Sequence, residues 1–332
     1  MKELETLKNL VVAPSSLTLN WAVETQTWYT EAEVFRVDGT PKQRLKIYDS
    51  FVGSTQNGNP SVLILSKDTL KGKDNALISS LKFNMTVADE AHFLRNLKTA
   101  QSRALHSIQT ERKYALTGTP TVKSGIDIYG ILSWLYPQEF SSYWDFVNRY
   151  FEMWESITGG VEIGEYNPKR KKELQELIGF RSVQRKRQDK GVMDWLPPKT
   201  NIVIPVEMDS KQRKVYKEME DTFVTQDDEG NMIDAMTILT QLLRLRQLCI
   251  DPVLVGIDAP SAKNKALIEY LEDNQQPVVI MSMFTSYLKI LEGQLKQRGF
   301  KVGMIHGELS TNAKHQAKDD FQAGKTDVLL CN

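Results

Sequence analysis

The stretch Asn84-Met-Thr-Val-Ala-Asp-Glu-Ala-His-Phe-Leu-Arg-Asn96 decides the fold prediction. It begins with a short apolar run of the strand type and continues into two adjacent carboxylates, Asp89 and Glu90. Neighbouring like charges repel each other unless a cation or another partner compensates them. The pair therefore indicates that such a partner lies at the end of this strand.

The composition is that of an ordinary folded protein of about two domains. The chain has 332 residues, and its 41% hydrophobic content supports sizeable cores. Its 42 basic residues cancel its 42 acidic ones, so a polyanion would be held by local patches and not by net charge. Two distant cysteines and four histidines argue against a zinc module or a disulfide framework and favour a reducing compartment. No apolar run reaches the length of a membrane span, and the first residues lack a signal peptide's apolar region, which predicts a cytoplasmic protein.

Strand and helix signals alternate in both end regions of the chain. Short runs rich in β-branched residues alternate with helical stretches, which predicts parallel sheets covered by helices. The strands predicted before residue 125 are Leu10–Ala13, Val34–Val37, Val62–Leu65, Met85–Ala88 and Tyr114–Leu116. Those predicted after residue 263 are Val278–Met281, Val302–Ile305 and Asp327–Cys331. The predicted class is α/β, with two parallel-sheet lobes.

The middle of the chain has a different pattern. From residue 126 aromatic residues recur at helical spacings, which predicts a helical insertion up to Leu196-Pro-Pro-Lys199. A strand is predicted at Asn201–Val206, and helices follow it. The predicted division is a first lobe at 1–125, a helical insertion at 126–200, a second helical insertion with a lead-in strand at 201–262, and the start of a second lobe at 263–332. Cys249 and Met281 are expected in the core.

The acidic pair has the chemistry of a nucleotide site. Asp89-Glu90-Ala91-His92 follows a strand and precedes a polar turn, where nucleotide-hydrolysing α/β lobes have their second acidic motif. There one carboxylate holds magnesium, while the next aims and deprotonates the water that attacks the γ-phosphate. The alternative is an exposed strand end with solvated charges.

Further motifs occur in the order found in helicase superfamily two, and more narrowly in the Swi/Snf-type DNA translocases. Leu116-Thr-Gly-Thr-Pro120, at the end of the next strand, resembles the superfamily's third motif. Leu10–Leu17 with Asn20-Trp21 is similar to the first nucleic-acid motif, and His92–Asn96 to the His-x-x-Lys-Asn extension. Later similarities are Ile131–Pro137, Arg181–Lys199, Gln212–Tyr216, Leu243–Pro252, Val278–Phe284 and His306–Ser310. The resemblance implies two RecA-like lobes, each incomplete, with helical insertions.

The resemblance also implies roles in ATP hydrolysis, with ATP and Mg²⁺ as the expected cofactors. Asp89 would hold magnesium, Glu90 would be the general base, and His92 would link their loop to the third motif. Residues Thr117, Gly118 and Thr119 would couple the nucleotide state to the lobes. Simple turn chemistry is the alternative for the two threonines.

Duplex DNA, bound independently of its sequence, is the expected partner. The resemblance implies phosphate contacts in both lobes, and a concentration of positive charge adds a candidate patch in the insertion. The candidate residues are Pro14, Ser15, Ser16, Arg185, Lys186, Arg187, Ser282 and Thr285. Helix capping is the alternative for the hydroxyls, and a solvated face is the alternative for the basic run.

A phosphate-binding loop of the form G-x-x-x-x-G-K-[ST] is expected before Leu10 in such a protein, and the 332 residues contain none. Gly324-Lys325-Thr326 is a decoy, because Asp319 stands where the first glycine would fall and the tripeptide leads into a strand. The arginine fingers are expected beyond Asn332. We therefore expect no ATP hydrolysis by this chain alone, and completion by the missing N- and C-terminal parts, either in a longer reading frame or in trans.

The predicted function is that of a fragment of an ATP-dependent motor that moves along double-stranded DNA. One alternative is a strand-separating superfamily two helicase of phage or plasmid replication. Another is a non-catalytic nucleic-acid-binding or interaction module, if the chain is complete as given. No membrane partner is expected, and the expected location is the cytoplasm, or the nucleoid or nucleus if its DNA is there.

Overall fold

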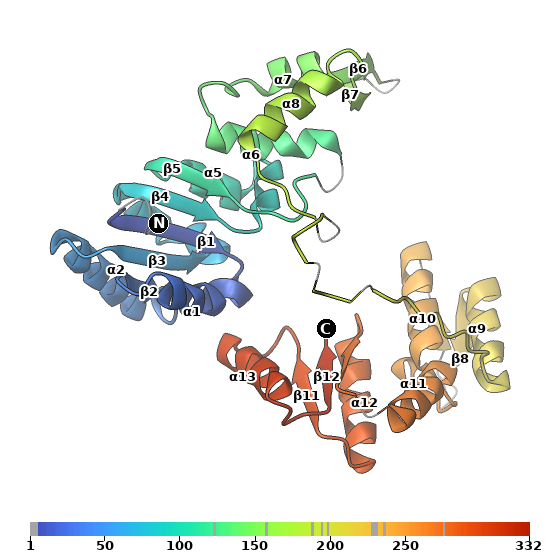
Figure 1. The fold of residues 1–332 in the computed structure, drawn as a ribbon. Coiled ribbons are helices and arrows are strands. Elements are labelled where there is room, and N and C mark those ends of the chain that lie inside the picture. Colours follow the sequence, from blue (N-terminus) through green and yellow to red (C-terminus); the bar gives the residue numbers. More distant parts are fainter. Residues whose placement is uncertain are drawn as a thin grey trace. The chain divides into compact units, whose positions relative to one another are not determined.

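The computed structural model describes residues 6–121, 124–156, 159–186, 189–193, 195–197, 199–226, 232–234, 237–274 and 276–332. The chain divides into two compact units, Met1–Trp195 and Leu196–Asn332 (Figure 1). Each unit contains a parallel sheet with helices, which confirms the predicted α/β class.

A five-stranded parallel sheet forms the centre of the first unit. Its order is β2-β3-β1-β4-β5, so that β1 lies in the middle and pairs with β3 and β4. The strands are β1 (Lys8–Ala13), β2 (Glu33–Arg36), β3 (Ser61–Ser66), β4 (Phe83–Ala88) and β5 (Thr110–Ala115). All five strands predicted for this region are present, within a few residues of the expected bounds.

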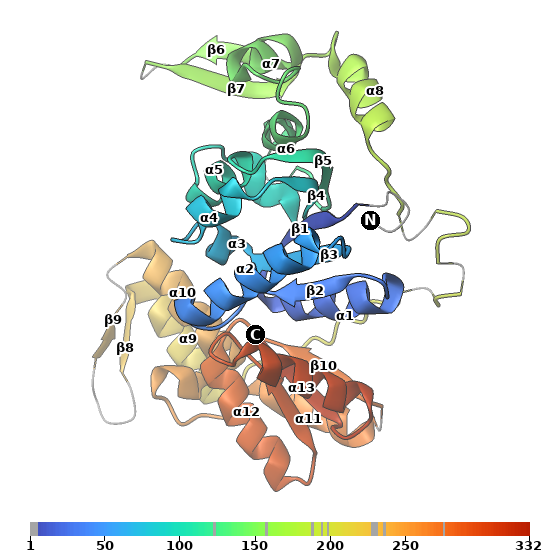
Figure 2. The same cartoon turned by 90° about the vertical axis from the view of Figure 1, so that its left-hand side faces the viewer.

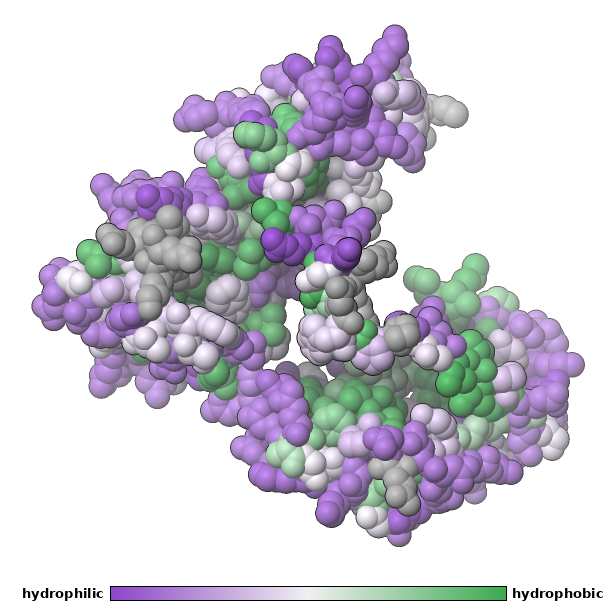
Figure 3. All heavy atoms as spheres, viewed as in Figure 1, coloured by the Kyte–Doolittle hydropathy of each residue, from purple (hydrophilic) through white to green (hydrophobic). Residues whose placement is uncertain are grey.

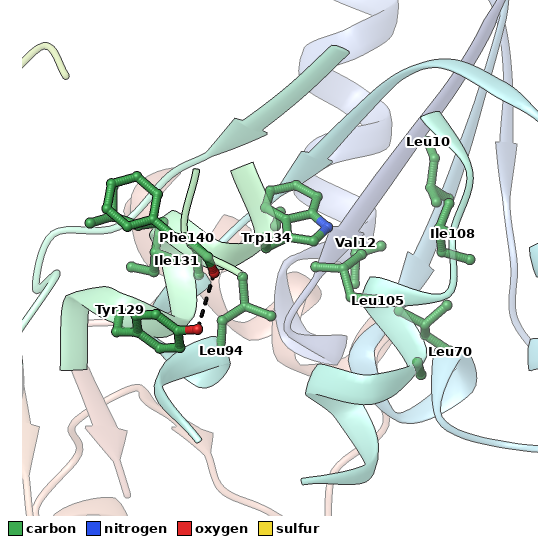
Figure 4. Packing of buried hydrophobic residues seen from close by; sticks show 14 of the residues in the cluster. Leu10, Val12, Leu70, Leu94, Leu105, Ile108, Tyr129, Ile131, Trp134 and Phe140 are labelled. Atoms are coloured by element: carbon green, nitrogen blue, oxygen red, sulfur yellow. Dashed lines mark hydrogen bonds between the residues drawn. The ribbon is translucent and has the colours of Figure 1, made fainter. Parts of the chain in front are cut away.

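Helices cover both faces of this sheet, so alternate residues of a strand enter different cores. Leu10 and Val12 belong to a large core with Phe51 of α2 and Leu105 of α5, and Figure 4 shows Val12 near Leu105. Val11 belongs to a smaller core on the side of α1. The helices are α1 (Thr18–Trp28), α2 (Pro41–Gln56), α3 (Lys67–Leu70), α4 (Asn75–Ser80) and α5 (Ala100–His106), with 3₁₀ turns η2 (Ser15–Leu17) and η3 (Ala91–Arg95).

The large core extends into the insertion through α6 (Ile128–Leu135), which follows η4 (Gly125–Asp127). Trp134 of α6 is 1% exposed, and its carbonyl accepts a 2.7 Å hydrogen bond from Lys113 Nζ on β5. Tyr129 donates its hydroxyl to the Phe140 carbonyl, a bond drawn in Figure 4. The insertion is therefore anchored to the sheet by its first helix.

The rest of the insertion is not purely helical, contrary to the prediction. Between α7 (Tyr143–Tyr150) and α8 (Lys171–Arg181) the chain forms an antiparallel hairpin of β6 (Phe151–Glu155) and β7 (Val161–Tyr166). The hairpin contains Trp154, whose spacing from the aromatic residues before it was interpreted as helical. Its strands are held by cross-strand contacts, and the ring centroids of Phe151 and Tyr166 lie 5.1 Å apart. The spacing of aromatic residues along the sequence does not reveal such contacts.

A three-stranded parallel sheet with order β10-β12-β11 forms the centre of the second unit. Its strands and helices are β10 (Val278–Met281), β11 (Val302–Ile305), β12 (Val328–Cys331), α11 (Ala262–Asp273), α12 (Thr285–Gln297) and α13 (Thr311–Gln322). A helical part precedes it, with α9 (Ser210–Thr222), the hairpin β8 (Val224–Gln226) and β9 (Met232–Asp234), α10 (Ile238–Ile250) and η5 (Pro252–Val255). Helices α9 and α10 lie side by side (Figure 2), joined by a 2.7 Å bond from Gln212 Nε2 to the Leu248 carbonyl.

Two predictions for this unit are wrong. Asn201–Val206 forms no strand: the segment has no regular secondary structure, and Val203 is 87% exposed. A β-branched run becomes a strand only when a neighbour accepts its backbone hydrogen bonds, and among the described residues none does. Met281 is 80% exposed instead of buried, because it lies with Val279 on the opposite face of β10 from the buried Ile280. Figure 3 shows further exposed apolar residues around α10. Leu239 of this helix is 80% exposed.

Within the described part of the chain, none of the helices combines the length and the apolar character that crossing a bilayer requires.

A partly buried ion pair lies beside the large core, next to Tyr48. Asp74 accepts hydrogen bonds from Arg44 Nε at 2.7 Å and Nη2 at 3.1 Å, and from the Tyr48 hydroxyl at 2.8 Å. The bonds from Arg44 are the main reason that the pKa of Asp74 lies below its ordinary value. This carboxylate therefore stabilises the folded state above the pKa it has when unfolded, and the contribution is lost as the pH falls through the lower, folded-state pKa.

We expect Asp74→Asn to lower the unfolding free energy of the first unit by about 1–3 kcal/mol at pH 7. The difference from the parent should shrink below about pH 4, where the parent's carboxyl also becomes protonated. All six tryptophans lie in the first unit, so tryptophan fluorescence during urea denaturation measures this change. Asp68→Asn is the control, because Asp68 pairs with Lys71 at an exposed position and its loss should cost less. A difference that does not vary with pH would contradict the assignment.

Candidate functional site

The acidic loop is fixed by main-chain hydrogen bonds to the strands on both sides of β4. Asp89 N donates to the Val12 carbonyl of β1 at 2.8 Å. On the other side, Leu116 N donates to the Ala88 carbonyl, and Ala91 N donates back to the Leu116 carbonyl at 2.9 Å. These bonds place the acidic pair at the carboxyl edge of the sheet, where parallel α/β proteins bind ligands.

Glu90 turns the chain sharply at this edge. Its backbone is left-handed, with φ of 48° and ψ of 50°, and among the described residues only Phe223 is another non-glycine residue with positive φ. This conformation costs an L-residue roughly 1–2 kcal/mol, and such residues concentrate at functional sites. The turn lets η3 begin at Ala91 while the Glu90 side chain remains 42% exposed.

The Asp89 carboxylate is held by two donors, one to each oxygen. Oδ1 accepts from Glu90 N at 2.8 Å, and Oδ2 accepts from the indole Nε1 of Trp21 on α1 at 2.8 Å. Each carboxylate oxygen can accept a second bond, so both retain capacity for a metal-bound water or an ion. The two donors also offset part of the repulsion from Glu90.

Glu90 has a separate partner in His92. Its Oε2 lies 3.1 Å from His92 Nδ1, although the contact lacks hydrogen-bond geometry. The main chain of Ala91 links this loop to the residue that begins the third motif, Leu116. Among the described residues there is no cluster of three or more His, Cys, Asp or Glu side chains that could hold a metal. The site nevertheless fits magnesium, which proteins often bind through one or two carboxylates together with water and substrate phosphates.

The Thr-Gly-Thr turn lies next to the acidic loop, because Leu116 pairs with both Ala88 and Ala91. Thr119 N donates to Thr117 Oγ1 at 3.1 Å, so the turn chemistry offered as the alternative role for Thr117 is present. Gly118 and Thr119 are exposed and Thr117 is half-buried. The candidate coupling residues are thus brought together with the candidate catalytic ones.

Pro14, Ser15 and Ser16 lie on the same edge of the sheet, between β1 and α1. Ser15 and Ser16 are exposed in η2, and no side-chain hydrogen bond caps this turn. Helix capping, the alternative role for these hydroxyls, is therefore not observed. The backbone of the turn is fixed by the bond from Leu17 N to the Pro14 carbonyl and by the bond from Thr18 Oγ1 to the Ser15 carbonyl.

The basic candidates of the insertion differ in how far their charge is already neutralised. Arg185 and Lys186 are exposed in the extended segment after α8, and Arg187 lies outside the described residues. By contrast, Arg149 and Arg170 both donate to Glu173, and these bonds lower the pKa of Glu173 to about 2. Arg185 and Lys186 are thus better placed than Arg149 and Arg170 to meet a polyanion.

Ser282 and Thr285 belong to the second unit, at the carboxyl end of β10. Ser282 N donates to the Cys331 carbonyl at 3.0 Å, and its Oγ accepts from Phe284 N at 3.3 Å. Thr285 is the first residue of α12, which has no side-chain cap, so N-capping is not observed here either. The decoy Gly324–Thr326 connects α13 to β12, the reverse of a phosphate-binding loop, as predicted.

Sequence reasoning did not identify the role of two residues, Trp21 and Gly130. Trp21 was noted only as part of a motif, and a sequence contains no sign of its bond to Asp89. Gly130 lies within α6, where an added Cβ would come within 2.1 Å of the Leu94 carbonyl oxygen in η3. A glycine inside an otherwise apolar helical run was the available signal for this close approach.

Two families of known proteins match successive parts of the chain. Residues 2–254 match the SNF2-related domain family. The chain belongs to that family. Residues 262–332 match the helicase conserved C-terminal domain. The two parallel sheets with their helices have the α/β architecture expected of this SNF2-related chain.

Two curated relatives of this SNF2-related chain are the chromodomain-helicase-DNA-binding protein 3 homolog of Caenorhabditis elegans and an uncharacterized ATP-dependent helicase of Mycoplasma pneumoniae. Both are 24% identical to it. The match to the first covers 95% of this chain and 19% of that relative. The match to the second covers 99% of this chain and 30% of that relative. The chain thus spans less than a third of the length of these relatives. Among solved structures, the Sulfolobus solfataricus SWI2/SNF2 ATPase core in complex with dsDNA covers the whole chain with 21% identity and a TM-score of 0.46, and this chain covers 68% of it.

We expect Gly130→Ala to push η3 away from α6 and to lower the unfolding free energy of the first unit by about 1–3 kcal/mol, because the methyl group would overlap backbone atoms. Gly53→Ala in α2 is the matched control: nothing lies within 4 Å of its added Cβ, so it should stabilise by about 0.5–1 kcal/mol. Urea denaturation followed by tryptophan fluorescence measures both. Equal stability of the two variants would contradict the close packing of α6 on η3.

Proposed function

We propose that this chain is part of the motor core of an ATP-dependent translocase on double-stranded DNA. The observation that carries the proposal is the main-chain link between the acidic loop and the Thr-Gly-Thr turn, through Ala88, Ala91 and Leu116. It joins a candidate hydrolysis site to a candidate coupling turn at the sheet's carboxyl edge. Membership of the SNF2-related family supports the same function.

Asp89 is the proposed magnesium ligand, and Glu90 is the proposed general base. Asp89 has a fixed carboxylate, since Trp21 and the Glu90 amide hold one oxygen each. When bound, magnesium supplies neutralisation of the phosphate charges. Glu90 is directed outwards by its left-handed backbone, where it would orient the attacking water and accept its proton. His92, close to Glu90, would steady that side chain.

DNA is proposed to be held through its phosphates, without base readout. The turn Pro14–Ser16 contributes exposed hydroxyls beside the nucleotide site, and Arg185–Arg187 contribute charge. Ser282 and Thr285 are the proposed contacts of the second unit. A motor that only tracks the duplex backbone needs no wedge, so strand separation is not part of this proposal. The proposed location is wherever this DNA lies.

Replacing Arg185 and Lys186 together with alanine should weaken duplex binding by the 332-residue chain. The slope of log K against log salt should become shallower by about 2, because each lost phosphate contact removes about 0.9. Fluorescence anisotropy with a labelled duplex over a salt series measures this slope. Arg149→Ala with Arg170→Ala is the matched control, since both charges are engaged by Glu173. If Arg185→Ala with Lys186→Ala leaves the slope unchanged from the parent, as the control does, these two residues are not a DNA contact.

A polypeptide of residues 1–332 should release no phosphate from ATP above background, with or without DNA. Its sequence has no G-x-x-x-x-G-K-[ST] loop, so the backbone amides and lysine that cradle the β- and γ-phosphates are not supplied. A coupled phosphate-release assay tests this, with Glu90→Gln as the control for contaminating ATPases. Turnover stimulated by DNA and abolished by Glu90→Gln would refute the prediction and show that this polypeptide is itself a complete ATPase.

A further inference from the structure

A side-chain hydrogen bond connects α1, the helix that follows the candidate DNA turn, to the candidate metal ligand of the first unit. Trp21 lies in the first part of α1, and its Nε1 donates to Asp89 Oδ2 at 2.8 Å. The indole is partly buried and packs against the smaller core formed by α1 and the sheet. Its N–H is thus aimed at the carboxylate by packing, so a movement of α1 would move the donor.

The segment between the DNA turn and Trp21 is continuous and helical. The 3₁₀ turn Ser15–Leu17 passes directly into α1 at Thr18, and Thr18 Oγ1 donates to the Ser15 carbonyl at 3.1 Å. Trp21 is therefore about one helical turn from Thr18. A displacement of Ser15 and Ser16 is carried along this segment by backbone hydrogen bonds and not by a flexible loop.

We propose that Trp21 is a positioning residue, through which phosphodiester contact at Ser15 and Ser16 changes the orientation of the Asp89 carboxylate. The inference rests on the proposed function, because it requires DNA at the Pro14–Ser16 turn. Since the other oxygen of Asp89 remains bonded to the Glu90 amide, a shift of the indole rotates the carboxylate about that bond. The direction in which Asp89 presents its free lone pairs to a metal then depends on DNA.

The indole N–H reports this coupling directly by NMR. The chain has six tryptophans, so ¹⁵N-indole labelling gives six signals, and Trp21→Phe identifies the one from Trp21. Asp89→Asn should move this signal upfield, because a neutral amide oxygen replaces a charged acceptor. A saturating 20-base-pair duplex should also shift it in the parent chain. Ser15→Ala with Ser16→Ala should abolish the DNA-induced shift, whereas the effect of Asp89→Asn should persist.

Trp28 provides the matched control on the same helix. Its Nε1 donates to Glu24 Oε2 at 2.9 Å, and its side chain is 77% exposed at the far end of α1. Its signal, identified with Trp28→Phe, should respond to Glu24→Gln but not to DNA, to Asp89→Asn or to the serine substitutions. Melting temperatures of all variants establish that they are folded, and only folded variants are compared.

The possible results separate this inference from the function on which it rests. If anisotropy shows duplex binding that Ser15→Ala with Ser16→Ala weakens, but the Trp21 signal does not move with DNA, the coupling is overturned and the proposed function stands. If the chain binds no duplex at low salt, the proposed DNA contact is overturned, and the coupling falls with it. Equal DNA-induced shifts at Trp21 and Trp28 would indicate a general effect on α1, which also overturns the specific role of Trp21.

Discussion

The main-chain bonds that fix Asp89 between β1 and β5 are the constraint on which the rest of the site depends. They tie the loop after β4 to Val12 on one side and to Leu116 on the other. Because these groups are backbone amides and carbonyls, the arrangement depends on the register of three parallel strands more than on particular side chains. The strands in turn are positioned by two cores, to which adjacent residues of β1 contribute in alternation. Correct folding of the sheet therefore assembles the site.

Most of the sheet framework could be predicted, because buried parallel strands appear in sequence as short β-branched runs between helical stretches. The prediction failed where structure depends on distant partners. Asn201–Val206 has the composition of a strand, yet composition does not supply a neighbour. The hairpin β6–β7 was missed for the opposite reason: Trp154 of β6 also fits a helical spacing with the aromatic residues before it, and only pairing across the hairpin decides between the two.

For the site, the residue types at the strand ends could be predicted, whereas their partners could not. Asp89 and Glu90 were identified because adjacent acids after a strand are chemically unusual. The bond from Trp21 joins residues 68 positions apart, and the contact of Gly130 with η3 joins α6 to a loop before β5. Such contacts depend on three-dimensional packing, of which a single sequence carries only traces, such as a glycine within an apolar helix.

The position of β5 at the margin of its sheet affects how the molecule behaves in solution. Among the described residues no strand pairs with its outer side, and Tyr114 is 44% exposed. Unpaired strand margins are templates on which other chains can add. Glu111 and Arg112 are exposed on β5, and charges at such a margin oppose that addition. Because salt screens these charges, self-association of the purified protein through the margin of β5 should increase with ionic strength.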